Sequence, residues 1–464
     1  MRFFGFGAVF IIGAMSIQAA VVLAAGKGTR MNSRVPKVLH SICGKSMIAL
    51  IVDAVNGAGL GVPLVVVPSD SHSIQNDLGE NVSYATQDMP MGTGQALLEA
   101  KQSLNGVDNI VVLYGDMPLV RPETLNKMIQ VHIDNQSCIT LLTAEVENPD
   151  GFGRIIRDNS GKIQEIIEDV EADEHTLSIN EVNGGVYCFQ SSWLWANLDD
   201  LSPSKSGERY LTDLISMAYD QSMMIDSIQV SNPMEILGVN TRKQLLMAET
   251  ELRQLILDRL MLSGVTLVDD ASVYVDYDVS IGSDTILHPN THVTGTSKIG
   301  ERCDIGPNSL VTNSIVGDKC KVSASFVEGS VIEEGTHVGP FSHIRPGTHL
   351  EEGVYVGNFA EVNRSRLGVG TKMGHYSYVG DADVGVNVNI GAGTVTCNFD
   401  GNAKHTTTIG NDVFIGSGSM LVAPVTIGDR SSTGAGSVVT KDVPPDTQVL
   451  GVPAKEFSKK DGNR

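Results

Sequence analysis

Apolar runs alternate with amphipathic stretches over the first half of the chain, from about Ser16 to Val230. The runs AAVVLAAG, VPLVVV, NIVVLYGD and ITLLTAEV have the length and apolar content of buried strands. Because strands that alternate with helical segments form sheets covered by helices, this half predicts an α/β domain with a mostly parallel sheet.

One segment with helical spacing of its apolar residues follows at 241–262, with the sequence TRKQLLMAETELRQLILDRLML. Its apolar residues near helical spacing are Leu245, Leu252, Leu255, Ile256 and Leu260. Gly264 follows as a stop signal, so the pattern predicts a connecting helix over 241–264.

Beyond this helix the apolar positions follow a six-residue rhythm. One register contains Ile281, Leu287, Val293, Ile299, Ile305 and Val311; a second contains Ile409, Ile415, Leu421, Ile427 and Val439, with Thr433 as its one polar member. This hexapeptide repeat predicts a parallel β-helix, whereas a β-sandwich would show period-two alternation with hairpin turns. The rhythm breaks at 397–410, which predicts a protruding functional loop.

Length, charge and cysteine content narrow the class of protein. The chain has 464 residues, enough for two or three domains, and a formal net charge of -21. Because binding to nucleic acid or anionic membrane begins with basic patches, we expect neither partner, and small molecules or protein instead. The six cysteines form no C-x-x-C motif, which predicts reduced thiols and a cytoplasmic location.

A glycine-rich loop, LAAGKGTRM, follows the first apolar run. Gly26 and Gly28 allow backbone N–H groups to approach phosphate oxygens, although a simple strand-end turn explains the loop equally well by itself. The loop lacks the third glycine of G-x-G-x-x-G and the ending of a Walker A motif. Lys37 and Asp116, which ends the run VVLYGD, favour a phosphate site at the edge of the sheet.

Together the motifs LAAGKGTRM, PKVL, GTG and YGDMPL resemble those of sugar-nucleotide pyrophosphorylases. With the hexapeptide repeat, the chain from about Ser16 onward is similar to the bifunctional N-acetylglucosamine-1-phosphate uridylyltransferase/glucosamine-1-phosphate N-acetyltransferases. The resemblance implies a Rossmann-like nucleotidyltransferase domain over 16–240, a linker helix over 241–264 and a left-handed parallel β-helix acetyltransferase domain over 265–464.

The resemblance also implies the residues of the first active site. Those for UTP and UDP-N-acetylglucosamine are Leu23, Ala24, Ala25, Gly26, Arg30, Lys37, Gln87, Gly92, Thr93, Tyr114, Gly115, Asp116, Gly153, Glu168, Asn183 and Asn240. In this set Gln87, Gly92 and Thr93 would contact the uracil. Gly153, Glu168 and Asn183 would hold the N-acetyl sugar.

Asp116 and Asn240 would bind Mg²⁺, because a hard cation takes oxygen ligands. The sugar-1-phosphate oxygen would attack the α-phosphorus of UTP in line, and pyrophosphate would leave. Mg²⁺, Arg30, Lys37 and loop amides would stabilise the developing charge, so this reaction requires no side-chain nucleophile.

In the repeat, His375 of KMGHYSYVGD matches the family's catalytic base, although a lone histidine in a repeat is more often a solvated turn residue. It would remove a proton from the sugar ammonium before the amine attacks the thioester. The residues implied for the acceptor sugar are Arg345, Asn363, Tyr378 and Asn389, and those for acetyl-CoA are Ala392, Asn398, Phe399, Ser417 and Ala435. Glu361 would orient the amine or the histidine, Ser417 would polarise the thioester, and Lys404 would reach a neighbouring subunit, which implies a homotrimer.

Four positions depart from the family pattern: Pro90, Asn363, Phe399 and Gly451. Pro90 stands where a glutamine is frequent in the uracil loop, and Phe399 replaces a tyrosine. Asn363 replaces a phosphate-binding lysine and Gly451 an arginine, so Arg364 and Lys455 are expected to supply the missing charge. We expect an active acetyl site with altered affinities.

The function implied is synthesis of UDP-N-acetylglucosamine from glucosamine-1-phosphate, acetyl-CoA and UTP, which feeds peptidoglycan and lipopolysaccharide precursors. One alternative keeps only the pyrophosphorylase and makes the β-helix a non-catalytic trimerisation scaffold. Another is a sugar-nucleotide enzyme for a different sugar, which predicts a much shorter repeat without His375.

The leader MRFFGFGAVFIIGAMS has two interpretations. Arg2, an apolar stretch at 3–12 and the small-x-small site Ala14-Met15-Ser16 are typical of a signal peptide, and the stretch is too short to span a membrane. Because UTP and acetyl-CoA are cytosolic, we expect instead a start-site extension that ends before Met15, and so a dispensable leader over 1–15.

Overall fold

The computed structural model describes residues 17–26, 28–89, 91–204 and 207–457, so the leader, Lys27 and Pro90 lie outside the described residues. Contacts divide the chain between Glu251 and Leu252 into two compact units, unit 1 before this point and unit 2 after it. The division falls within α8 (Arg242–Leu262). The presence of α8 confirms that the segment is helical, as its apolar spacing predicted. Both units therefore include part of α8, whereas the predicted domain limits set the helix apart as a linker.

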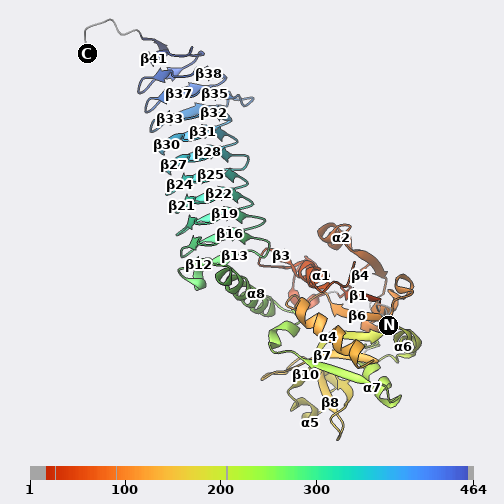
Figure 1. Ribbon diagram of the computed structural model, residues 1–464. Helices are drawn as coiled ribbons and strands as arrows, with labels where there is room; N and C mark the ends of the chain where they lie inside the picture. The colour runs from red at the N-terminus through yellow and green to blue at the C-terminus, as the bar shows by residue number, and fades with distance from the viewer. Residues whose placement is uncertain (1–16, 27, 90, 205–206, 458–464) are drawn as a thin grey trace, which may run out of the picture. The chain divides into compact units, whose positions relative to one another are not determined.

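Unit 1 is built on a mixed, mostly parallel sheet with the strand order β11-β7-β10-β6-β1-β4-β5 (Figure 1). Its strands are β1 (Gln18–Leu23), β4 (Leu64–Pro68), β5 (Ser83–Gln87), β6 (Asn109–Tyr114), β7 (Ile139–Glu145), β10 (Glu181–Gln190) and β11 (Ile225–Gln229). β1 pairs in parallel with both β4 and β6, whereas β10 runs antiparallel to β6 and β7. A short antiparallel pair, β8 (Arg154–Arg157) and β9 (Ile163–Ile167), extends from β10.

Helices cover both faces of this sheet. Successive residues of β1 point to opposite faces, so Ala20 and Val22 join one apolar cluster while Val21 and Leu23 join another. The first cluster includes residues of α1 (Met47–Gly57), α2 (His72–Leu78) and α4 (Pro122–Asp134); the second includes residues of α3 (Thr93–Leu98), α6 (Ser191–Asn197) and α7 (Asp213–Asp220). The predicted α/β class is confirmed.

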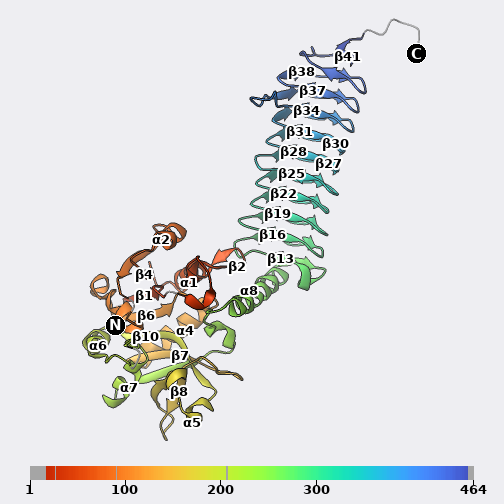
Figure 2. The same cartoon turned by 180° about the vertical axis from the view of Figure 1, so that it is seen from behind.

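Unit 2 is a left-handed parallel β-helix whose coils stack three parallel sheets (Figure 2). The first sheet runs in parallel from β12 (Thr266–Leu267) to β41 (Gln448–Gly451) and ends on an antiparallel strand, β42 (Ala454–Glu456). The second runs from β13 (Tyr274–Val275) to β40 (Val438–Val439), and the third from β14 (Ser280–Ile281) to β38 (Val425–Ile427). Every apolar residue of the two predicted registers is buried, and so is Thr433. The hexapeptide prediction is confirmed.

The stack continues through the region between the two registers, although the sequence rhythm is irregular there. Val316 follows Val311 after five residues rather than six, and both are buried in successive strands. A corner of the coil has lost one residue at such places, while the strand pairing stays parallel from coil to coil. The corners therefore absorb differences in length that break the periodicity in sequence.

Small buried polar residues line the corners of the coils. Thr285 is fully buried and its hydroxyl donates to the backbone oxygen of Gly300 in the next coil, at 2.8 Å. Cys303 takes the same position one coil later, with Sγ 3.1 Å from the oxygen of Gly317. None of the six cysteines, all of which lie in the described residues, is joined to another in a disulfide.

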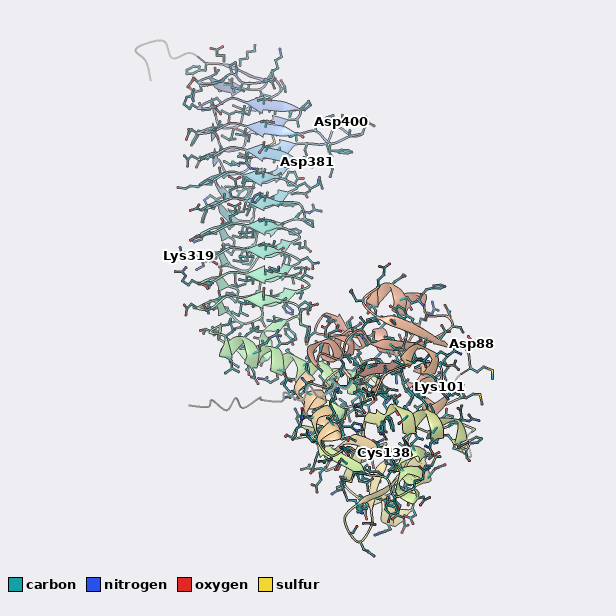
Figure 3. All side chains as sticks on the ribbon, turned by 45° about the vertical axis from the view of Figure 1, so that its right-hand side comes forward. Asp88, Lys101, Cys138, Lys319, Asp381 and Asp400 are labelled. Atoms are coloured by element: carbon teal, nitrogen blue, oxygen red, sulfur yellow. The ribbon has the colours of Figure 1, made fainter. Side chains whose placement is uncertain are left out.

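The predicted loop interrupts the stack between β34 (Val395–Cys397) and β35 (Thr407–Ile409). Figure 3 shows Asp400 out on this loop and Asp381 on the stack beside it. The loop closes on itself, since His405 N donates to the oxygen of Asn398 at 2.7 Å and the His405 ring contacts Asp400 at 2.7 Å. In the described part of the chain, no helix has the length and apolar character needed to cross a membrane.

Candidate active sites

The carboxyl ends of three parallel strands of unit 1 meet at one edge of the sheet. Leu23 at the end of β1 pairs with Tyr114 at the end of β6, and Gln87 ends β5. Gly115 N donates to the oxygen of Leu23 at 2.8 Å, so the glycine-rich loop and the YGD segment lie side by side. Ligands of open α/β sheets bind at this edge, where the predicted nucleotide residues gather.

Gly28 brings the glycine-rich loop against Lys37. Its φ is 59°, and a Cβ at this position would lie 2.5 Å from Cβ of Lys37. Only glycine fits such a close approach in the left-handed region. Arg30 follows in the short turn Thr29–Met31 and is exposed, with its charge at the same loop.

Lys37 joins the two predicted metal ligands. Its Nζ forms an ion pair with Asp116 and donates to Oδ1 of Asn240 at 3.0 Å. Val239 N also donates to the oxygen of Asp116 at 2.8 Å, which holds the Asn240 segment beside the end of β6. A carboxylate and an amide oxygen thus converge on one cationic group, a donor set that fits a hard divalent cation completed by water and phosphate oxygens. Among the described residues no cluster of three His, Cys, Asp or Glu side chains offers a different metal site.

The predicted uracil residues lie against the backbone of Arg209. Gly94 N donates to the oxygen of Arg209, and Arg209 N donates to the oxygen of Met91, both at 2.9 Å. At Gly92 a Cβ would lie 2.5 Å from the backbone of Arg209, so the site requires glycine. Gln87 is buried, and among the described residues its amide Nε2 has no hydrogen-bond partner, which leaves a donor for a ligand.

The predicted sugar residues converge as well. Asn183 N donates to the oxygen of Gly153 at 2.8 Å, and a Cβ on Gly153 would lie 3.6 Å from Oε2 of Glu168. Burial raises the pKa of Glu168, although Thr212 donates to its Oε1 at 3.0 Å. Three residues that are distant in sequence therefore form one polar cluster around a partly desolvated carboxyl group.

Hydrogen bonds connect the uracil and sugar residues through two tyrosines. The hydroxyl of Tyr114 bonds to Thr93 and to Tyr187. Tyr187 is fully buried, and its hydroxyl accepts from Nδ2 of Asn183 at 2.7 Å. Burial raises the pKa of Tyr114 and of Tyr187, so both hydroxyls remain protonated donors. The network fixes Thr93 and Asn183 relative to each other.

In unit 2, His375 is the first of four predicted residues that lie above one another in successive coils, in a column at one corner of the β-helix. Gly393 N donates to the oxygen of His375, Gly418 N to Ala392 and Gly436 N to Ser417, so successive coils stack in register. The column consists of His375, Ala392, Ser417 and Ala435, which are partly or fully exposed. The predicted base and three predicted coenzyme residues thus share one corner.

Other predicted residues lie at the next corner of the same coils. The predicted residues Arg364 and Asn398 follow the strands β28 (Glu361–Asn363) and β34, whereas His375 precedes β31 (Tyr378–Gly380). Asp381, which follows β31, was not predicted and lies at the same corner. Strand residues advance about 3.3 Å each, so a strand of this length separates the corners by roughly 10 Å. Phe399 is exposed on the loop at the second corner and pairs there with Lys404. One chain therefore divides the predicted acetyl site between two corners.

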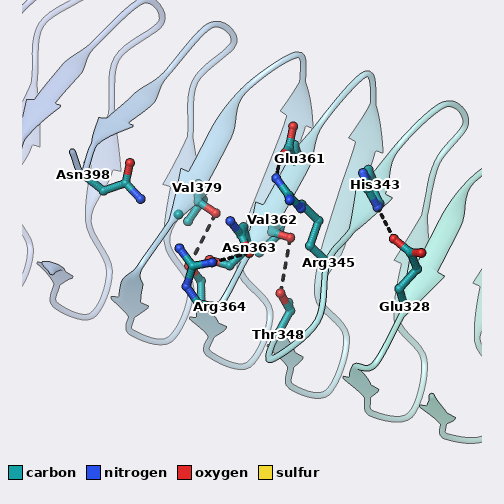
Figure 4. Close-up of polar contacts among 12 residues, drawn as sticks. Glu328, His343, Arg345, Thr348, Glu361, Val362, Asn363, Arg364, Val379 and Asn398 are labelled. Carbon is teal, nitrogen blue, oxygen red and sulfur yellow. Dashed lines mark hydrogen bonds and ion pairs between the residues drawn. The ribbon is translucent and has the colours of Figure 1, made fainter. Parts of the chain in front are cut away.

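The predicted sugar residues Arg345 and Tyr378 flank Glu361. Arg345 Nη1 contacts Oε1 of Glu361 at 2.9 Å (Figure 4), and Glu361 pairs with Tyr378 in the next coil. Asn389 lies on the first sheet, exposed, and pairs with Lys372. The carboxylate of Glu361 is thus directed at Arg345 rather than at the His375 corner.

The structure shows the contacts of two positions that depart from the family pattern, Asn363 and Gly451. Asn363 is buried, and its Oδ1 accepts from Arg364 Nη1 at 3.3 Å (Figure 4). Arg364 also forms a bidentate pair with Asp381, at 2.7 and 2.9 Å, which lowers the pKa of Asp381; Asn398 donates to the same carboxylate. At the second departure, Gly451 pairs with Ala454 in a terminal hairpin and Lys455 pairs with Leu450.

Sequence reasoning missed Asn358, Arg209 and Thr212, which contact the predicted site residues. Asn358 precedes His375 by one coil, at an offset of 17 residues, whereas three units of the six-residue rhythm would place the stacked position at about 18. Arg209 and Thr212 carry no comparable signal, because they reach the site through pairing between segments over 40 residues apart.

Known families match both units. Residues 19–232 match the nucleotidyl transferase family, and residues 278–313, 329–364 and 406–441 match the bacterial transferase hexapeptide family (six repeats). The chain is 43% identical over 432 residues to "Bifunctional protein GlmU" of Heliobacterium modesticaldum, covering 93% of this chain and 94% of that protein. It is 46% identical over 432 residues to the protein of the same name from Fervidobacterium nodosum, with 93% and 94% coverage. Since these relatives match nearly their whole length at such identity, the chain belongs to the GlmU family of bifunctional proteins.

Proposed function

We propose that the chain makes UDP-N-acetylglucosamine in two steps. Unit 2 acetylates glucosamine-1-phosphate with acetyl-CoA, and unit 1 transfers a uridylyl group from UTP to the acetylated sugar. The observation that carries the proposal is the match of both units to bifunctional relatives, with the nucleotidyl transferase segment in unit 1 and the hexapeptide segments in unit 2. The first product is the second substrate, and the final product feeds peptidoglycan and lipopolysaccharide precursors.

In unit 1 the sugar-phosphate oxygen attacks the α-phosphorus of UTP, the bond from that phosphorus to the bridging oxygen breaks, and pyrophosphate leaves. Lys37, Arg30 and the loop amides hold the charge that develops on phosphate oxygens. Gln87 and Thr93 orient the uracil, and the cluster around Glu168 binds the sugar. The buried donor of Gln87 supports this assignment, since a base carbonyl would satisfy it.

The proposed cofactor is Mg²⁺, held by Asp116 and Asn240. When bound there it would neutralise phosphate charge and draw the substrates together. The contacts of Lys37 with both ligands support the site, because they place two oxygens around one positive charge. Lys37 would then turn from these oxygens to the phosphates.

In unit 2, His375 takes a proton from the ammonium of the sugar, and the free amine attacks the thioester carbon. The C–S bond breaks, and the coenzyme thiolate leaves and takes up a proton. Arg345 and Arg364 bind the sugar phosphate, and the column of Ala392, Ser417 and Ala435 lies along the coenzyme.

We further propose a homotrimer located in the cytoplasm. The separation of the predicted acetyl residues between two corners supports the trimer, because a neighbouring copy would bring the second corner of one chain to the first corner of another. Lys404 on the protruding loop would take part in this contact. Cysteines that form no disulfide and the cytosolic origin of both co-substrates support the location.

One assay of the purified protein tests the two activities separately. Glucosamine-1-phosphate, acetyl-CoA, UTP and Mg²⁺ are supplied together, and free thiol and pyrophosphate are followed in parallel. We expect both products from glucosamine-1-phosphate. Pyrophosphate that forms only when N-acetylglucosamine-1-phosphate is added would show that unit 2 is a scaffold without acetyl transfer.

A further inference from the structure

The ring of His375 is held by an amide from the preceding coil. His375 ends β30 (Lys372–His375) and Asn358 ends β27 (Tyr355–Asn358), and the two residues are paired in register. Nδ1 of His375 lies 2.7 Å from Oδ1 of Asn358. Tyr376 N donates to the backbone oxygen of Asn358 at 3.0 Å, so the strand ends that carry both side chains are also joined.

This contact determines which ring nitrogen carries the proton. An amide oxygen only accepts hydrogen bonds, so Nδ1 of a neutral ring must carry the hydrogen, and the lone pair stays on Nε2. A base needs that lone pair free and directed at the substrate, and the tautomer is set by the partner of the other nitrogen.

We propose that Asn358 is a positioning residue that fixes His375 in the tautomer with hydrogen on Nδ1 and a free lone pair on Nε2. The inference rests on the proposed acetyl transfer in unit 2. An amide performs this task without adding a charge next to the base. Asn358 is half-buried beside the exposed His375, so its side chain acts through the histidine and not on the substrate.

Side-chain ¹⁵N NMR of the full-length chain reads the tautomer directly. The signals of His375 are identified among the 11 histidines by their absence in His375→Gln. At a pH where the ring is neutral, we expect hydrogen on Nδ1 in the unmodified chain and in Asn358→Asp, which keeps an acceptor oxygen. In Asn358→Leu we expect the hydrogen to shift largely to Nε2. An unmodified chain with hydrogen on Nε2 would overturn the proposal.

Acetyl-transfer kinetics on the same variants provide the second readout. Asn358→Leu should lower kcat by on the order of 10²-fold, because the base is misoriented, with little change in either KM. Asn358→Asp should recover most of this loss. Thr294→Val is the matched control, since it removes a 2.8 Å side-chain bond to Thr312 between two other coils and should leave kcat unchanged.

The proposal on Asn358 and the proposed function fail in different ways. If the unmodified chain transfers no acetyl group, the function assigned to unit 2 is wrong, whereas the NMR measurement still reports the tautomer. If His375→Ala abolishes acetyl transfer but Asn358→Leu retains full kcat, His375 is the base and Asn358 does not position it. The melting temperature of each variant separates loss of folding from loss of positioning.

Discussion

Nζ of Lys37 donates to Oδ1 of Asn240 at 3.0 Å, although 203 residues separate them. Asn240 lies two residues before the start of α8, and its backbone N donates to the side chain of Gln244 at 2.9 Å. From the sequence alone it would be taken for an ordinary residue at the start of a helix. The contact with Lys37 instead places Asn240 at the edge of the sheet where the predicted nucleotide residues gather.

Asn240→Ala should therefore raise the Mg²⁺ concentration that half-saturates uridylyl transfer, and lower its rate by on the order of 10²-fold at limiting metal. Pyrophosphate release titrated with MgCl₂ measures both effects. Release of thiol from acetyl-CoA by the same sample is the control and should not change. An unaltered Mg²⁺ titration would remove Asn240 from the metal site.

Gly28→Ala should impair uridylyl transfer by displacing Lys37. The new Cβ would meet Cβ of Lys37 at 2.5 Å, and the backbone would keep a φ of 59°, which costs roughly 1–2 kcal/mol for an L-residue. We expect a lower kcat for pyrophosphate release and a lower unfolding midpoint of unit 1. Full activity with a normal midpoint would mean that the loop closes on Lys37 differently.

Glu168→Gln should stabilise unit 1 while weakening sugar binding. Burial raises the pKa of Glu168, so between its ordinary value of 4.5 and the raised value the native state binds more protons than the unfolded state. Stability therefore falls as pH rises through this window, and the ionised carboxylate stays destabilising above it.

The glutamine variant removes this dependence, so its unfolding midpoint should exceed that of the unmodified chain at pH 7 and match it more closely below pH 4.5. Both tryptophans, Trp193 and Trp195, lie in unit 1, so their fluorescence follows this unit alone. A lower midpoint at pH 7 would contradict the argument.

Arg364→Met should raise the KM for glucosamine-1-phosphate by roughly tenfold or more, since a hydrogen bond to a charged group contributes about 1.5–3 kcal/mol. Asp381→Asn should have the opposite effect, because it releases Arg364 from a carboxylate that competes with the phosphate. Steady-state thiol release over a range of sugar phosphate measures both. Equal KM values in all three proteins would assign phosphate binding to other residues.

His375→Ala should lower acetyl transfer by about 10²- to 10⁴-fold, as expected for loss of a general base. Pyrophosphate formation from N-acetylglucosamine-1-phosphate and UTP should persist in the same sample and serves as the control. Acetyl transfer that survives this substitution would favour another base.

The sequence by itself determined the fold class of each half. Hydrophobic periodicity is a local property, so it can be recognised from consecutive residues without knowing which segments pack against them. Runs such as VVLYGD predicted the covered sheet, and Ile281 and its successors at six-residue spacing predicted the β-helix. The family resemblance supplied the candidate residues. Those for the nucleotide gather at one edge of the sheet in unit 1 because they follow the carboxyl ends of parallel strands.

Only the tertiary structure decided how distant residues meet. The continuity of the coils between the two registers depends on corners that lose a residue, which periodicity alone does not detect. Lys37 with Asn240, and Asn358 with His375, are contacts made by chain folding and coil stacking. The division of the acetyl residues between two corners likewise has no signal in sequence, since a position in a coil is set by every corner that precedes it.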